Sequence, residues 1–284
     1  MNDFRKVSDD SGLIVSSVNT NAPLQPQNLT NSYNDIKKSL EALKQNNTYQ
    51  TRLDYGASFA RFNLAYLNSW RSTANKPYLS SALFTEHHVY EKQFQERLGF
   101  FINSFNLISE MSVASKWPST KDPHGNVTEL YKDDKKFFGE NLIKEIQPDP
   151  NNLLLFLERA TLYLNTPVAR QEFVKLLLDV TIQQNINISE LEIPDHYVEG
   201  QKELKGLDVL GDYLYKMYNS SLAEIKKEGK DTVQNREFRQ DLLLLYKKNT
   251  GHIAFADRTL LETLLAKEPN KALQNELKEM LKPY

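Results

Sequence analysis

Apolar residues recur at intervals of three and four along most of the chain, which is the spacing of one face of an α-helix. The first such series joins Ile36, Leu40 and Leu43. A second series, rich in aromatic residues, runs from about residue 51 to residue 72 and stops before Pro77, because the residue preceding a proline avoids helical angles. The pattern predicts two long helices in this part of the chain.

The next apolar series runs from about Ser80 to Met111 and is long for a single helix of a globular protein. Gly99 lies inside it. Because glycine costs about 1 kcal/mol in a helix interior, we expect a kink or a break near this residue.

A segment rich in proline and glycine, residues 116–126, then interrupts the helical pattern. We expect it to be a loop that separates an N-terminal helical unit, residues 32–116, from a C-terminal helical-hairpin domain, residues 127–284. The first helix of the second domain is expected from Thr128 to Ile146.

Residues 1–31 are rich in Ser, Asn, Asp and Pro and have no sustained period, which predicts a flexible N-terminal arm. The alternative is an arm that folds onto a partner through a small apolar anchor, formed by Leu13, Ile14 and Val15.

The second domain carries signals for short helices joined by short connections. Asp149-Pro150 and Thr166-Pro167 each place a capping oxygen before a proline suited to the first helical position. They predict helices over about residues 150–164 and 167–184, in an antiparallel hairpin. Later helices are expected within residues 204–229, from Phe238 to Gly251, from Asp257 to Ala266 and after Pro269.

These features predict an all-α fold, in which a multi-helix bundle continues into stacked helical hairpins. The chain lacks sustained two-residue alternation and has 10 glycines, too few for a hairpin-rich β fold. From Asp149 to Tyr284 it resembles tetratricopeptide, HEAT and armadillo repeats in helix length and proline placement, which implies solenoid character. The tetratricopeptide pattern of small and aromatic residues is absent.

Charge and composition narrow the classes of partner. Lys and Arg number 35 against 37 Asp and Glu, with neither half of the chain basic, which disfavours nucleic acid as the main partner. The absence of cysteine excludes disulfides, thiolate catalysis and cysteine-ligated zinc. No apolar run approaches the roughly 18 residues of a membrane span, so no membrane span is expected.

Candidate catalytic and metal-binding residues are few. His87 and His88 lie four and three residues before Glu91, so one helix face could offer a metal an imidazole and a carboxylate. The paired Glu-x-x-His motifs of di-metal helical bundles are absent, and we expect a solvated helix face. Asp133-Asp134 invites comparison with the magnesium-binding helices of isoprenoid synthases, but Lys135 and Lys136 follow, which favours an exposed charged helix.

Three other histidines, His124, His196 and His252, lack an orienting partner in the sequence and are expected in loops or at helix ends. Glycine-rich phosphate loops and glycine-flanked nucleophilic serines are also absent. We therefore expect no catalytic residue, no bound metal and no cofactor. The alternative is an enzyme with an unrecognised active site in a helical fold.

The chain is rich in aromatic residues, with 14 tyrosines, 14 phenylalanines and 2 tryptophans. Tyr213, Tyr215 and Tyr218 lie within six residues of each other, so they cannot all point at one core. Because tyrosine anchors many interfaces, these three residues are the predicted binding residues.

The chain resembles helical secreted effectors of intracellular bacteria such as Legionella, which use a type IV route. The resemblance rests on many asparagines, a polar arm, the lack of cysteine, and glutamates near the end, Glu268, Glu276 and Glu279. It implies a bacterial cytoplasmic protein that is secreted into the host cytosol and binds another protein there. The partner would be a host protein or another effector that the chain restrains, as a metaeffector does.

Overall fold

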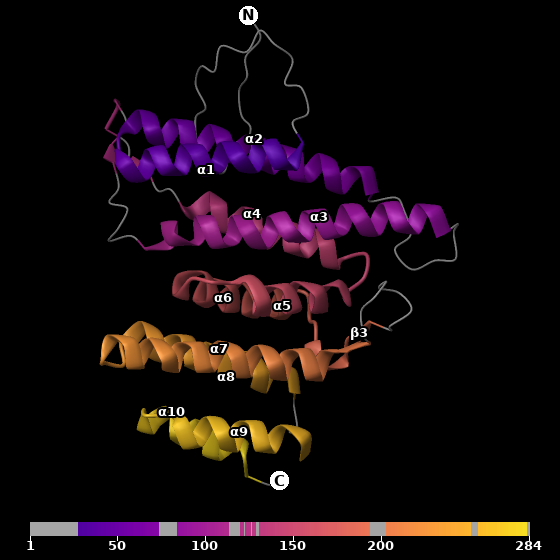
Figure 1. Cartoon of the computed structure of the whole chain (residues 1–284), viewed down its shortest axis with the longest axis vertical. Helices are drawn as coiled ribbons and strands as arrows, with labels where there is room; N and C mark the ends of the chain where they lie inside the picture. Colours follow the sequence, from indigo (N-terminus) through magenta and orange to yellow (C-terminus); the bar gives the residue numbers. More distant parts are fainter. Residues whose placement is uncertain are drawn as a thin grey trace, which may run out of the picture. The chain divides into compact units, whose positions relative to one another are not determined.

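The computed structural model describes residues 28–73, 84–113, 120–121, 123–125, 127–128, 131–193, 203–250 and 255–282. Within these residues the protein is all-α, with ten α-helices and two antiparallel ladders of two residues per strand (Figure 1). The predicted fold class is confirmed at this level. The predicted N-terminal arm falls, up to residue 27, outside the described residues.

The chain divides into two compact units, residues 1–141 and residues 142–284. The division falls inside one helix, α4 (Tyr131–Ile146), and therefore later in the chain than the proline- and glycine-rich segment at 116–126. The domains over residues 32–116 and 127–284 stay a prediction.

Unit 1 contains three helices of 17 to 25 residues before α4. They are α1 (Leu29–Gln45), α2 (Tyr49–Thr73) and α3 (Phe84–Ile108), followed by the 3-10 turn η1 (Ser109–Ser112) and by the paired strands β1 (Thr120–Lys121) and β2 (Val127–Thr128). Asn28 caps α1 by accepting a hydrogen bond from Asn31 N at 2.8 Å. The strand pair was not expected from the sequence, and α4 begins three residues after Thr128.

The predicted break at Gly99 is wrong, because α3 continues through this residue as a regular helix. Leu98 and Phe101, on either side of it, are fully buried. Burying such side chains contributes about 1.5–3 kcal/mol each, which outweighs the cost of about 1 kcal/mol for a helical glycine.

Aromatic rings fill the core of unit 1. Phe137 and Phe138 are adjacent on α4, and Phe137 contacts rings of α2 whereas Phe138 contacts rings of α3. Phe137 meets Phe59 edge to face with ring centroids 5.2 Å apart, and Phe138 meets Phe105 at 4.7 Å. Edge-to-face pairs add about 0.5–1.5 kcal/mol beyond the burial of area. The aromatic series of the sequence therefore serves mainly as core in this unit.

Unit 2 continues with six helices in three successive pairs (Figure 1). They are α5 (Asn152–Tyr163), α6 (Pro167–Gln183), α7 (Gly206–Glu228), α8 (Val233–Thr250), α9 (Phe255–Lys267) and α10 (Lys271–Met280), with the 3-10 turn η2 (Ile188–Glu190) and the strands β3 (Glu192–Ile193) and β4 (Leu204–Lys205) between α6 and α7. The pair α7–α8 is central: α5 and α9 pack on α7, whereas α6 and α10 pack on α8. No solenoid repeat is recognised in the described residues.

Local capping rules account for several boundaries in unit 2. Thr166 caps α6 by accepting from Ala169 N at 3.1 Å, and Gly229 ends α7 in the left-handed region at φ 72°, as predicted. Other starts are displaced: α5 begins two residues after Pro150 and α10 two residues after Pro269, whereas Asp257, the expected cap of α9, is its third residue. For example, α10 is capped by Asn270, whose side chain accepts from Ala272 N and Leu273 N.

The start of α7 is packed closely against the preceding turn. Gly206 N donates to Leu191 O at 2.7 Å, and a Cβ on Gly206 would lie 1.8 Å from Ile188 O. Only glycine allows this approach, because a side chain would collide with backbone.

We expect Gly206→Ala to lower the free energy of unfolding by about 1–3 kcal/mol or more, since 1–3 kcal/mol is the usual cost of overpacking. Gly99→Ala is the matched control, since a Cβ there meets nothing within 4 Å and removal of a helical glycine should stabilise by about 1 kcal/mol. Urea unfolding monitored by circular dichroism measures both. Equal effects of the two substitutions would contradict the close approach at Gly206.

Candidate functional site

The three predicted binding tyrosines lie on different sides of α7. Tyr213 and Tyr218 are fully buried in unit 2, whereas Tyr215 is 38% exposed. Tyr213 packs against Phe173 of α6, with ring centroids 6.4 Å apart. The prediction that the three tyrosines do not share one direction is consistent with this arrangement, but only Tyr215 can contact a partner of the folded unit.

Tyr215 is held in place by neighbours on two helices. The Lys267 ammonium, at the end of α9, lies 5.4 Å from the centroid of the Tyr215 ring. Lys267 Nζ also donates to Asn219 Oδ1 at 3.2 Å, and Asn219 Nδ2 donates to Tyr215 O at 2.7 Å. Lys216, the next residue of α7 after Tyr215, forms an ion pair with Asp212 at 2.8 Å. We call these five residues the Tyr215 surface.

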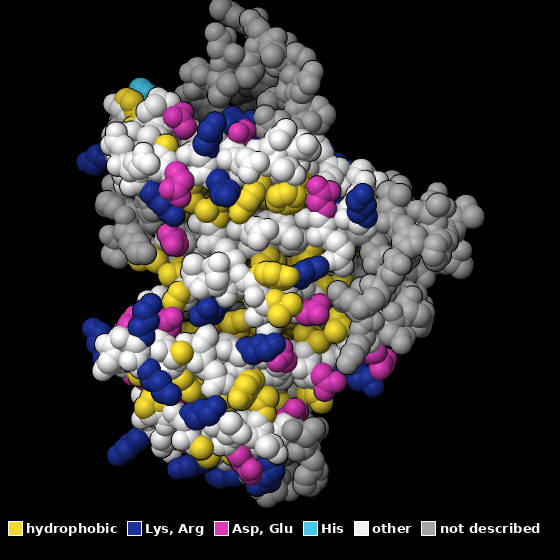
Figure 2. Space-filling model, in the orientation of Figure 1, with side chains coloured by type: hydrophobic (Ala, Val, Ile, Leu, Met, Phe, Trp, Pro, Cys, Tyr) yellow, Lys and Arg dark blue, Asp and Glu magenta, His cyan; other side chains and the backbone are white. Residues whose placement is uncertain are grey.

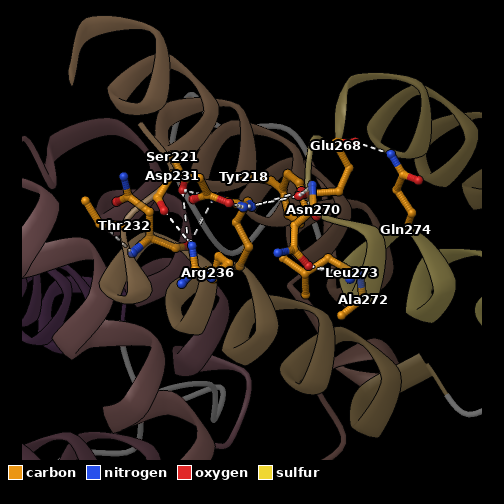
Figure 3. A network of polar contacts seen from close by, with 12 residues as sticks. Tyr218, Ser221, Asp231, Thr232, Arg236, Glu268, Asn270, Ala272, Leu273 and Gln274 are labelled. Atoms are coloured by element: carbon orange, nitrogen blue, oxygen red, sulfur yellow. Dashed lines mark hydrogen bonds and ion pairs between the residues drawn. The ribbon is translucent and has the colours of Figure 1, made fainter. Parts of the chain in front are cut away.

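A buried charged network connects α7 with α8 and with the turn that follows α9 (Figure 3). Its centre is Arg239 of α8, whose side chain is fully buried. The guanidinium donates to Glu268 Oε2 at 2.9 Å and to Asp231 Oδ2 at 2.7 Å, and also reaches Ser221 Oγ at 3.1 Å. We call Tyr218, Ser221, Asp231, Arg239 and Glu268 the Arg239 network.

Glu268 connects this network to the last two helices. Its carboxylate accepts from Tyr218 Oη at 2.6 Å and from Asn270 N at 2.8 Å, and its carbonyl accepts from Gln274 Nε2 at 2.6 Å. Burial raises the pKa of Tyr218, and the hydrogen bond to Glu268 and the negative charge of Glu268 raise it further. The hydroxyl therefore stays protonated and donates. Lys267, next to Glu268 in the chain, is thereby fixed at the Tyr215 surface.

The two carboxylates keep Arg239 charged. Burial by itself lowers the pKa of this guanidinium. Asp231 and Glu268 outweigh the effect of burial through their hydrogen bonds and their negative charges, so the pKa is raised. A buried charge of this kind is tolerated only when it is fully paired and hydrogen-bonded. The network therefore holds α7, α8, α9 and α10 together.

A second buried acid, Asp257 on α9, lies near Tyr246 of α8. Burial raises the pKa of Asp257, the nearby Tyr246 hydroxyl lowers it, and the charge of Asp208 raises it again. Among the described residues, neither Tyr246 Oη nor Asp257 Oδ2 forms a regular hydrogen bond. Asp257 is therefore an acid whose ionisation costs stability.

The other candidate groups of the sequence are distributed as follows. Asp134 is buried in unit 1 and accepts a hydrogen bond from Tyr55 Oη at 2.9 Å, so the expected exposed position is wrong for this residue. His124 is exposed. The side chains of His87, His88, Glu91, Asp133, His196 and His252 lie outside the described residues. No group of three or more potential ligands converges on a metal position in the described part of the chain.

Comparison with known proteins gives no relative: no family model, curated protein or solved structure matches the chain. None of the described helices is both long and apolar enough to cross a membrane.

The Arg239 network was not predicted from the sequence. Arg239 follows Phe238 and precedes Leu242, so it lies within the apolar stripe of α8, and a charge in such a stripe signals a buried partner. Glu268 was noted only as one of three glutamates near the end of the chain, and its partner is 29 residues away.

We expect Glu268→Ala to destabilise unit 2 by about 3–5 kcal/mol, because it leaves Arg239 as a buried charge with one carboxylate fewer. Glu262→Ala is the matched control on α9. It removes an exposed carboxylate that pairs with Arg258 at 3.0 Å, and should cost less than about 1 kcal/mol. Chemical denaturation measures the difference, and a similar small cost for both would show that the network is not stabilising.

We also expect stability to fall as pH rises through the titration of Asp257. Because the pKa of the folded state is raised, the folded protein retains a proton that the unfolded chain has already lost, so unfolding becomes easier as pH increases. Asp257→Asn should raise the unfolding midpoint at neutral pH and flatten this dependence. Asp212→Asn, which removes an exposed acid of α7, is the control for the loss of one carboxylate and should not raise the unfolding midpoint as Asp257→Asn does.

Proposed function

We propose that the chain is a protein-binding module that works without chemistry of its own, through the Tyr215 surface of unit 2. One observation carries the proposal: Tyr215 is an exposed aromatic ring with a lysine over its face, on helices fastened together beneath it. Exposed aromatic anchors of this kind dominate the energetics of many interfaces.

The fixed position of the ring favours binding. Association costs roughly 0.5–1.5 kcal/mol for each flexible side chain that becomes ordered. At the Tyr215 surface, Lys267 already lies over the ring and its ammonium donates to Asn219 before any partner arrives. The Arg239 network holds α9 against α7 and so keeps Lys267 at this place.

The paired helices of unit 2 support a scaffold role with solenoid-like character. Stacked hairpins create extended surfaces that suit a protein partner, and α7 lies between α5 and α9 in contact with both. We extend the proposal to the role that the effector resemblance implies, in which the partner is a host protein or another effector that the chain restrains. Near-neutral charge and the lack of a membrane-spanning helix among the described residues are consistent with a protein partner.

A second candidate is an enzyme that uses Asp257 and Tyr246. The observation in its favour is a buried carboxyl with a raised pKa beside a hydroxyl, since perturbed acids often mark active sites. A small molecule that copurifies with the protein and is lost in Asp257→Asn would favour this candidate over the binding module.

We expect Tyr215→Ala to abolish or strongly reduce the capture of protein partners from source and host lysates, while helicity is unchanged. Loss of a central anchor costs about 2 kcal/mol or more, a decrease of roughly thirtyfold in affinity. Tyr163→Ala is the matched control, because Tyr163 is also exposed and has Arg159 over its ring at 5.6 Å. The same partners, identified by mass spectrometry, must be retained by the control. Retention of all partners by Tyr215→Ala would contradict the proposal.

A further inference from the structure

Lysines gather at one end of the helices of unit 2, where the turns between α7 and α8 and between α9 and α10 lie. Figure 2 shows Lys and Arg side chains along the lower left, where Figure 1 has these two turns. Five exposed lysines belong to this end, and we call them the basic end: Lys226, Lys227, Lys230, Lys267 and Lys271. The Arg239 network brings the two turns together, because Arg239 contacts both Asp231 and Glu268.

The acids that could neutralise these lysines are used elsewhere. Asp231 follows Lys230 and Glu268 follows Lys267, but both carboxylates turn inward to Arg239. Burial lowers the pKa of Arg170, the charge of Glu224 opposes this shift, and Glu228 is the exposed acid of these turns within the described residues. None of the five lysines forms an ion pair in the part of the chain that the structure describes.

Three other exposed cations of unit 2 do pair, whereas Lys247, Lys248 and Lys278 form no ion pair within the described residues. Lys216 pairs with Asp212, Arg258 with Glu262 and Lys282 with Glu279, all at a spacing of three or four residues. The basic end is distinguished by the number of its lysines: five lie at two neighbouring turns, with Glu228 as the exposed acid among them. Its net charge is positive and is available to an external group.

The basic end also offers apolar contact. Val233, at the first position of α8, is 60% exposed, and Tyr215 lies beside Lys267. Side-chain caps already occupy part of the backbone donors at these turns, because Asn270 Oδ1 accepts from Leu273 N and Thr232 Oγ1 accepts from Asn235 N. Lysines beside apolar anchors suit a protein segment that carries both carboxylates and an apolar side chain.

We infer that the basic end and Tyr215 form one docking surface for an acidic protein segment, in which Asp or Glu side chains flank an apolar or aromatic residue. The inference rests on the proposed function and adds the chemistry of the partner. Carboxylates of the segment pair with the lysines, and its apolar residue packs on Val233 or Tyr215. Charge complementarity fixes the partner's register and speeds association.

The probe for this inference is a fluorescein-labelled peptide that alternates Glu with Gly around one Trp, titrated with the full chain and followed by anisotropy. We expect Lys226→Gln/Lys227→Gln to weaken binding about fivefold, from the usual worth of exposed ion pairs. The matched control is Lys247→Gln/Lys248→Gln, which removes two lysines from the last turn of α8 and so changes the same charge at a helix end. Thermal unfolding of both variants measures any loss that comes from helix ends alone.

Further measurements distinguish the alternatives. Binding should weaken as salt rises, because the screening length falls from about 10 Å at 0.1 M to about 3 Å at 1 M. Equal loss of binding in both double variants, or tighter binding of a labelled single-stranded oligonucleotide than of the peptide, would overturn the inference. If Tyr215→Ala removes captured partners while the lysine variants retain them, the proposed function stands and the acidic partner does not. If neither the peptide nor any partner binds, both fail.

Discussion

The buried guanidinium of Arg239 is the constraint on which unit 2 depends. Moving a charge out of water costs several kcal/mol, and the cost is offset only when every donor finds an acceptor. Here two carboxylates, a hydroxyl and the Asn235 carbonyl supply the acceptors, from the turn before α8, the residue after α9, α7 and α8 itself. Because the acceptors belong to different segments, the charge can be satisfied only when these segments are assembled.

The same interaction shapes the surface. By drawing Asp231 and Glu268 inward, Arg239 leaves the neighbouring lysines without their nearest acids. By fixing Glu268, it also fixes Lys267 and so the ring of Tyr215. An interior ion pair and an exposed recognition surface are thus two results of one arrangement.

The sequence predicted what depends on near neighbours. The cap at Thr166 and the stop at Gly229 follow from residues within a few positions, and both were correct. The continuation of α3 through Gly99 and the burial of Asp134, Tyr213 and Tyr218 depend on packing between distant segments. Asp134, for example, meets Tyr55 across 79 residues, and no periodic pattern carries that information.

The position of Glu268 has a consequence for how unit 2 folds. In a repeat array, each hairpin contacts only its neighbours and a terminal hairpin can be lost while the rest stays folded. Here the turn between α9 and α10 supplies the counter-ion for a charge inside α8. The last hairpin is therefore not a detachable cap, and α7 to α10 should fold and unfold as a single cooperative block.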